Sequence, residues 1–110
     1  MILEIKNRSI LHIFPCESII YCKAEGNYTC FVLEDKKVIA YQTLKNTCRI
    51  LPNCDFCRCH NSYIVNLSKI REFDTKRNVL ILKNKLPIPV SNRRKMDLQN
   101  ALKTFITHHS

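Results

Sequence analysis

Hydrogen-bonding side chains gather in the middle of the chain, in the segment Arg58-Cys-His-Asn-Ser62. This segment leads directly into Tyr63-Ile-Val-Asn66, whose aromatic and β-branched residues are typical of a buried strand. The abrupt change predicts a polar loop or strand end that is held by a rigid scaffold. Because Arg, Asn and His side chains reach base edges and phosphates, the segment indicates a nucleic-acid contact. The alternative is a polar turn in which His60 makes a structural hydrogen bond.

A second group with the same chemistry stands at the start of the last predicted helix. Ser91 can cap this helix, and Arg93, Arg94 and Lys95 then fall in its first turn. Cations at a helix N-terminus oppose the macrodipole by a few tenths to about 1 kcal/mol, so helix stability does not explain them. Contact with phosphates or bases is one explanation, and a solvated basic face is the other.

The cysteines indicate free thiols. Their odd number, seven, and the lack of an apolar N-terminal segment favour a reduced, cytoplasmic protein. Cys54, Cys57, Cys59 and His60 have the residue types of a zinc site, but no second ligand pair follows, so we expect no metal or other cofactor. Cys59 adjoins His60, so it is either a redox-sensitive thiol that modulates binding or a buried strand cysteine.

Enzymatic chemistry is not indicated. The chain has no phosphate-binding glycine loop, no GxSxG and no HExxH, and its acidic residues fall mostly in predicted turns. His12 lies in an apolar strand, and His108 and His109 lie at the C-terminus. We therefore expect a binding protein that is not an enzyme.

Composition and charge indicate one globular domain, over residues 1–110, with a polyanionic partner. The chain is 45% hydrophobic and 25% charged, and it has no apolar run long enough to span a membrane. The net charge is +9, and it is uneven: residues 1–55 hold seven Lys and Arg against six Asp and Glu, whereas residues 56–110 hold eleven against three. A basic half favours phosphates, since binding them releases counterions.

The elements that position these groups are mostly strands. Runs of β-branched and aromatic residues predict strands at 2–6, 9–14, 18–24, 28–33, 38–41, 63–66, 69–73 and 79–82, and an extended segment at 86–90. The spacing of Leu44, Cys48 and Leu51 predicts a short helix that Thr43 caps and Pro52 ends. Leu98, Ala101, Leu102 and Phe105 predict the closing helix.

Together these segments resemble the LytTR DNA-binding domain over nearly the whole chain. The resemblance rests on Ile19-Ile-Tyr, Ala24-Glu-Gly-Asn-Tyr28, the helix at Leu44, Phe56-x-Arg-x-His-x-Ser-Tyr-x-Val-Asn66, and Ile88-Pro-Val-Ser91 followed by the basic group. It implies a mostly β fold with short helices, in a barrel-like or sandwich-like arrangement with a closing C-terminal helix. It also implies that loops, and not a recognition helix, enter successive grooves of double-stranded DNA.

The resemblance assigns residues to three loops. These are Asn27 and Tyr28, then His60 and Asn61, then Asn92 and Arg93. Arg93 would hydrogen-bond guanine O6 and N7, and Asn61 would contact a base edge or a phosphate. The residues expected to position the phosphate backbone are Lys23, Ser62, Arg94 and Lys95. Some relatives have His where this chain has Tyr28, and the receiver domain common in the family is absent from this chain.

The expected function is sequence-specific DNA binding in bacterial transcriptional regulation, as the output domain of a two-component response regulator. The resemblance further implies a homodimer or paired binding on repeated sites. Three alternatives stay open: a protein-interaction module that keeps the fold without specific DNA binding, a single-strand or RNA binder with stacking aromatics, and a zinc module. The aromatics fall mostly within apolar runs, which is typical of a core.

Overall fold

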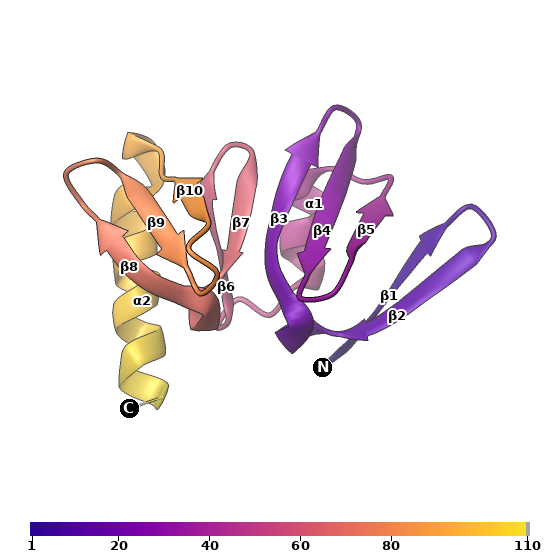
Figure 1. The fold of residues 1–110 in the computed structure, drawn as a ribbon, viewed down its shortest axis with the longest axis horizontal. Helices are drawn as coiled ribbons and strands as arrows, with labels where there is room; N and C mark the ends of the chain where they lie inside the picture. The colour runs from indigo at the N-terminus through magenta and orange to yellow at the C-terminus, as the bar shows by residue number, and fades with distance from the viewer. Residues whose placement is uncertain (110) are drawn as a thin grey trace.

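Alternation of apolar and polar residues builds three antiparallel sheets in residues 1–109, the part of the chain that the computed structural model describes. The sheets stand side by side, with a two-stranded hairpin at one end and the C-terminal helix at the other (Figure 1). Both termini lie at the lower edge in this view. The strand order is β1-β2 in the first sheet, β5-β4-β3-β7-β6 in the second and β10-β9-β8 in the third.

The predicted strands are confirmed with small shifts at their ends, and the structure adds β6, whose residues 58–60 were expected in a polar loop or strand end. Their bounds are β1 Ile2–Asn7, β2 Ile10–Pro15, β3 Ile19–Glu25, β4 Tyr28–Leu33, β5 Lys37–Ala40, β6 Phe56–His60, β7 Tyr63–Asn66, β8 Ile70–Asp74, β9 Val79–Leu82 and β10 Pro87–Pro89. The helices are α1 Leu44–Ile50 and α2 Lys95–His109, with 3-10 turns η1 Cys16–Ser18, η2 Leu67–Lys69 and η3 Asn92–Arg94.

One core lies between the five-stranded sheet, the β1–β2 hairpin and α1. Phe31 and Ile19 are fully buried at its centre, and Leu44 brings α1 onto it. The Thr43 side chain accepts a hydrogen bond from the Asn46 N–H at 3.1 Å, so the predicted helix cap is confirmed.

A second core lies between the three-stranded sheet, β6 and β7, and α2. Leu98 is fully buried on the inner side of α2, and Ala101, Leu102 and Phe105 pack around the same core. The apolar spacing predicted for the closing helix is therefore confirmed.

Asn66 lies at the end of β7 and connects this strand to the start of its neighbour β3. The side chain is 3% exposed, and its Nδ2 donates to the Ile19 carbonyl at 2.8 Å. Its Oδ1 accepts from the Ser68 N–H at 3.0 Å and from the Ser68 hydroxyl at 2.8 Å. This amide therefore fixes how β3, β7 and η2 meet.

The start of α2 differs from the prediction. The Ser91 side chain makes no cap hydrogen bond, and its buried Oγ has no partner among residues 1–109. Instead the Ser91 N–H donates to the Cys59 carbonyl at 3.0 Å, and the Ser91 carbonyl accepts from the Arg94 N–H at 3.1 Å. These bonds hold Ser91 against β6 and close the 3-10 turn η3, so the α-helix begins only at Lys95.

The predicted class, mostly β with a closing helix, is confirmed, but none of the sheets in the described chain closes into a barrel. In the five-stranded sheet, β5 and β6 form the two edges. Neither described helix combines the length and the apolar character needed to cross a membrane.

Candidate nucleic-acid interface

Four connections meet along one edge of the molecule, at the top of Figure 1. They are the β3–β4 turn, the β6–β7 turn, η3 and the β8–β9 turn. The first three contain the three loops named from the sequence. Three hydrogen bonds join the four in series: Ala24 N–H to the Ser62 carbonyl at 2.9 Å, Ser91 N–H to the Cys59 carbonyl at 3.0 Å, and Asn78 Nδ2 to Asn92 Oδ1 at 2.6 Å.

A β-bulge positions His60. Arg58 pairs with Ile64 but His60 pairs with Tyr63, so Cys59 is the extra residue and the strand is re-aimed beyond it. The His60 Nδ1 accepts a hydrogen bond from the Ser62 N–H at 3.1 Å. The neutral ring therefore carries its proton on Nε2, which leaves one donor for a base or phosphate oxygen. His60 thus combines the structural role and the capacity for contact, which the sequence had presented as alternatives.

Asn61 stands exposed at the tip of the β6–β7 turn. Its carbonyl accepts from Arg58 Nη2 at 2.7 Å, and its side-chain amide has no hydrogen-bond partner in the described chain. Arg58 therefore stiffens the turn, and the amide stays available. A free amide presents a donor and an acceptor together, which is the pattern that adenine N7 and N6 complement.

Lys23 lies beside the same turn. It pairs with Tyr63 across β3 and β7, and its Nζ is 5.9 Å from the centre of the Tyr63 ring. The Tyr63 ring also meets the His60 ring edge-on, with centroids 5.7 Å apart. The aromatic contact holds the ammonium group next to the β6–β7 turn, where it can meet a phosphate.

The β3–β4 turn is less basic than the others. Gly26 adopts a φ of +60°, which the turn requires, and Asn27 is exposed beside it. Tyr28 is hydrogen-bonded to Glu25, and the charge of Glu25 is the main cause that raises the pKa of the Tyr28 hydroxyl. Tyr28 also contacts the Tyr41 ring edge-on at 6.2 Å. Asn27 is therefore the residue of this turn that is free to contact DNA.

The residues of the third loop point in different directions. Asn92 and Arg93 are exposed, and Arg93 has no partner in the described chain. Lys95 donates through Nζ to the Thr75 carbonyl at 2.5 Å. Arg94 instead lines a groove with Cys57 and other residues between α1 and α2, and its buried Nε has no partner there among residues 1–109. The structure therefore brings Asn92 and Arg93 to the edge with Asn61, but not Arg94.

The β8–β9 turn supplies basic side chains that were not assigned from the sequence. The Asp74 Oδ1 accepts from the backbone N–H groups of Lys76 and Arg77 at 3.1 and 3.0 Å, which fixes the turn. Both side chains are exposed, and the Asn78–Asn92 bond places the turn next to η3. The sequence predicts the turn and its two cations, but not its neighbour, because that contact joins residues 14 positions apart.

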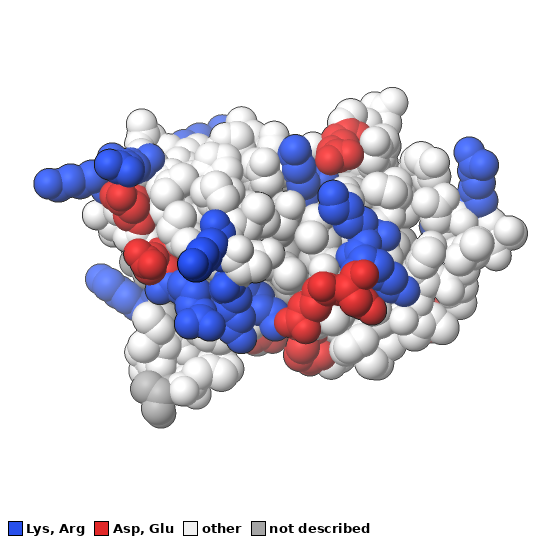
Figure 2. All heavy atoms as spheres, viewed as in Figure 1, with Lys and Arg blue, Asp and Glu red and all other residues white. Residues whose placement is uncertain are grey.

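Not all basic residues of the second half lie at this edge. Since β8 runs toward it and β9 runs away, the residues before β8 and after β9 lie at the opposite end of the same hairpin. Figure 2 shows a cluster of Lys and Arg on the lower part of the visible face. By the element bounds, Lys69 comes before β8, and Lys83 and Lys85 come after β9, so these three lie away from the edge; Lys69 pairs with Glu34 at 2.7 Å.

Cys59 is next to His60 in the sequence, but its side chain is buried and does not reach the edge where the loops meet. The side chain is fully buried, with its Sγ 3.7 Å from the Pro89 carbonyl, and burial raises the pKa of the thiol to about 12. A protonated, enclosed thiol reacts slowly, which favours the buried strand cysteine over the redox-sensitive thiol. No group of His, Cys, Asp or Glu in residues 1–109 gathers closely enough to hold a metal ion.

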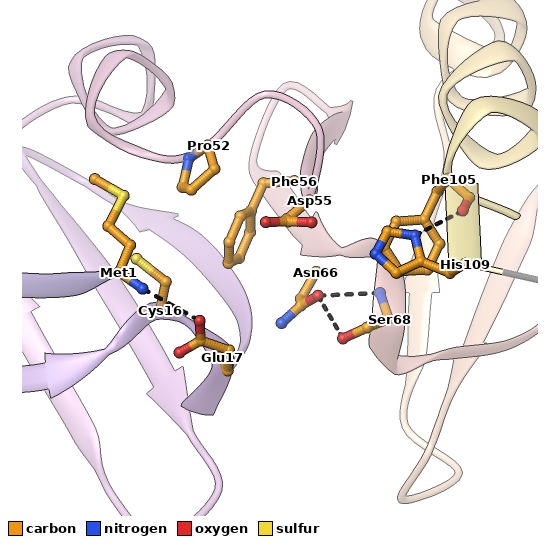
Figure 3. Close-up of a pocket in the computed structure, with 10 residues that line it drawn as sticks. All are labelled: Met1, Cys16, Glu17, Pro52, Asp55, Phe56, Asn66, Ser68, Phe105 and His109. Atoms are coloured by element: carbon orange, nitrogen blue, oxygen red, sulfur yellow. Dashed lines mark hydrogen bonds and ion pairs between the residues drawn. The ribbon is translucent and has the colours of Figure 1, made fainter. Parts of the chain in front are cut away.

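A cavity of about 330 Å³ lies at the lower edge, with Met1 on one side and His109 of α2 on the other (Figure 3). On one side Glu17 pairs with the N-terminal amine of Met1 at 3.3 Å, and on the other the His109 ring stacks on Phe105. None of the ten residues assigned to DNA binding lines this cavity. It is therefore separate from the candidate interface.

The chain is similar in sequence and in fold to known proteins. Residues 9–103 match the profile of the LytTr DNA-binding domain. The transcriptional regulatory protein NatR of Bacillus subtilis is 36% identical over 69 residues, which are 63% of this chain and 30% of NatR. The transcriptional regulatory protein YpdB of Escherichia coli K12 is 31% identical over 94 residues, which are 82% of this chain and 38% of YpdB. The chain thus spans well under half the length of either relative.

The fold has a solved counterpart. A LytTr DNA-binding domain from Bacillus cereus superposes with a TM-score of 0.80 at 25% sequence identity. The superposition covers 92% of this chain and 95% of that one.

Proposed function

This chain belongs to the LytTr DNA-binding domain family, and on that premise we propose that it regulates transcription by inserting the loops of its upper edge into the grooves of double-stranded DNA. The single observation that carries the proposal is the hydrogen-bonded series of loops, which presents Asn61 and Arg93 on one edge with free side chains. A rigid row of loops can enter successive grooves, because their spacing is fixed before binding.

Each residue has a role that its chemistry supports. Arg93 is proposed to contact guanine O6 and N7, and the Asn61 amide an adenine edge or a phosphate. Asn27, Asn92 and the His60 Nε2–H would add hydrogen bonds from the neighbouring loops.

The residues proposed to hold the backbone are Lys23, Ser62 and Lys95, and from the β8–β9 turn Lys76 and Arg77. The four cations contribute through their charge and the Ser62 hydroxyl through a hydrogen bond, and neither contribution depends on the base sequence. We leave Tyr28 and Arg94 out of direct contact, since Tyr28 is paired with Glu25 and Arg94 faces the groove between the helices.

We also propose that the domain acts as the DNA-binding part of a two-component response regulator and binds in pairs on repeated sites. This setting is supported by the names of the relatives, which are transcriptional regulatory proteins longer than the matched segment.

The test is a fluorescence-anisotropy titration of wild type, Asn61→Ala and Arg93→Ala on a duplex obtained by selection and on a scrambled duplex, over a salt series. Each substitution should cost about 1 to 3 kcal/mol on the selected duplex and much less on the scrambled one. Lys103→Ala, an exposed charge on α2 outside the loops, is the control and should change neither affinity. Equal binding of both duplexes by all four proteins would contradict specific contact and favour a protein-interaction module.

A further inference from the structure

The β1–β2 hairpin has one face on the core and one face in solvent. Residues paired directly across an antiparallel ladder have their side chains on the same face. Leu3 pairs with Phe14, and both are buried in the first core. The outward pairs are Ile2 with Pro15, Glu4 with Ile13, and Lys6 with Leu11.

The outward face is apolar to an unusual degree for a surface. Ile2 is 61% exposed, Leu11 50% and Ile13 59%, and they are contiguous on a ladder of only two strands. Figure 2 shows that the hairpin end of the molecule, on the right, is mostly uncharged. A contiguous apolar patch on a protein surface is typical of an interaction site.

The two charges on this face have an order that makes it complementary to itself. Glu4 lies beside Ile13, and Lys6 lies beside Leu11 one outward position further along the ladder. A twofold axis that lies between two facing hairpins, perpendicular to the strands at the level of Ile5, places Glu4 of each copy over Lys6 of the other. The same operation places Ile13 over Leu11 of the other copy.

We propose that this outward face of β1–β2 is a homodimer interface, in which a second copy of the chain packs face to face about that axis. The apolar pairs supply the attraction, and the two Glu4–Lys6 pairs fix the antiparallel register, because the parallel twofold arrangement would place Glu4 over Ile13 and Lys6 over Leu11 of the other copy and leave both charges without a partner. The match to the family profile begins at residue 9, so β1 and both charged residues lie outside it.

The interface leaves the DNA-binding edge free. None of the ten residues assigned to DNA binding lies in the hairpin, which is at the opposite end of the molecule from η3 and the β8–β9 turn (Figure 1). The contact area is one short hairpin, which is characteristic of a weak dimer. On DNA, tethering of two copies would raise their effective concentration and strengthen it. Only this role on DNA rests on the function proposed above.

The test uses sedimentation velocity over a range of protein concentrations without DNA. Glu4→Lys brings two lysines together at each contact, and Lys6→Glu brings two glutamates together, so each single variant should weaken dimerisation about tenfold or more. The double variant Glu4→Lys/Lys6→Glu should dimerise like wild type. An equimolar mixture of the two single variants should form heterodimers, since each Lys then faces a Glu. Lys45→Glu, an equal change of charge on the exposed side of α1, should have no effect.

Two outcomes overturn the proposal. One is a wild-type protein that stays monomeric at every concentration. The other is a dimer that the charge reversals leave unchanged, or that the mixture fails to restore, since the copies would then meet elsewhere. Anisotropy on a duplex with one half-site, with Arg93→Ala as the comparison, tests DNA binding separately, so either proposal can fail alone.

Discussion

Replacing Lys76 and Arg77 with glutamine should weaken binding to every DNA sequence alike, because the β8–β9 turn offers charges and not base contacts. Each phosphate that the protein neutralises contributes about 0.9 to the slope of log K against log salt concentration. At 0.1 M salt, the loss of one such contact therefore lowers the affinity for DNA about eightfold. Two such contacts give at most about 60-fold. Arg77 also lies 3.8 Å from an Asp74 carboxylate oxygen, which retains part of its charge within the turn. We therefore expect a loss of about 10-fold to 60-fold and a slope lower by about 1 to 2.

The matched control is Lys83→Gln/Lys85→Gln, which removes the same two charges from the far end of the same hairpin. Four residues of β9 separate the two ends, a distance of roughly 14 Å at about 3.4 Å per residue. This exceeds the Debye length of about 10 Å at 0.1 M salt, so the control should change affinity by less than about twofold.

The assay is a salt series of anisotropy titrations on the selected and the scrambled duplex. Equal losses in the two variants would refute the reasoning, because affinity would then follow net charge and not the position of the turn. A loss confined to the selected duplex would refute it in another way, since the turn would then contact bases. The turn itself should survive, because its backbone bonds to Asp74 do not use the replaced side chains.

Three further predictions concern stability and reactivity. Asn66→Ala should lower the free energy of unfolding by about 2 to 4 kcal/mol in urea titrations, because it leaves buried backbone groups unpaired; a loss below about 1 kcal/mol would mean that water replaces the amide. Cys54 is exposed and should react with a thiol reagent at pH 7.5 well before Cys59, as peptide mass spectrometry would show; comparable rates would revive a redox role for Cys59. The hydrogen bond and charge of Lys69 hold the pKa of Glu34 below its usual value, so this carboxylate stabilises the fold above the ordinary glutamate range and ceases to do so as the pH falls through its lowered pKa. Glu34→Gln should therefore reduce the loss of stability between neutral and acidic pH, and an unchanged profile would show that solvent screens the pair.

Local signals in the sequence predict most of the elements. Strand periodicity locates the β-strands because each sheet has one buried face, and Thr43 and Pro52 bound α1 through hydrogen bonding and ring geometry that act within a few residues. Ser91 shows where this reasoning ends. Its sequence context is that of a helix cap, but a backbone bond to Cys59, 32 positions away, holds it against β6 and a 3-10 turn forms instead. The open sheets, in place of the expected barrel, likewise depend on strand pairing that no local pattern specifies.

Two bonds in the series that aligns the loops join backbone atoms, so the alignment depends little on the side chains proposed to contact DNA. The Ala24–Ser62 and Ser91–Cys59 bonds use only N–H and carbonyl groups, and the Asn61 amide and the Arg93 side chain take no part in them. Substitutions at Asn61 and Arg93 should therefore change which bases are bound while the loops stay in place. Asn78 and Asn92 are the exception, because their side chains form the third bond. Asn92→Ala should consequently reduce affinity on all duplexes by releasing the β8–β9 turn, whereas a change limited to one base position would show that Asn92 contacts that base directly.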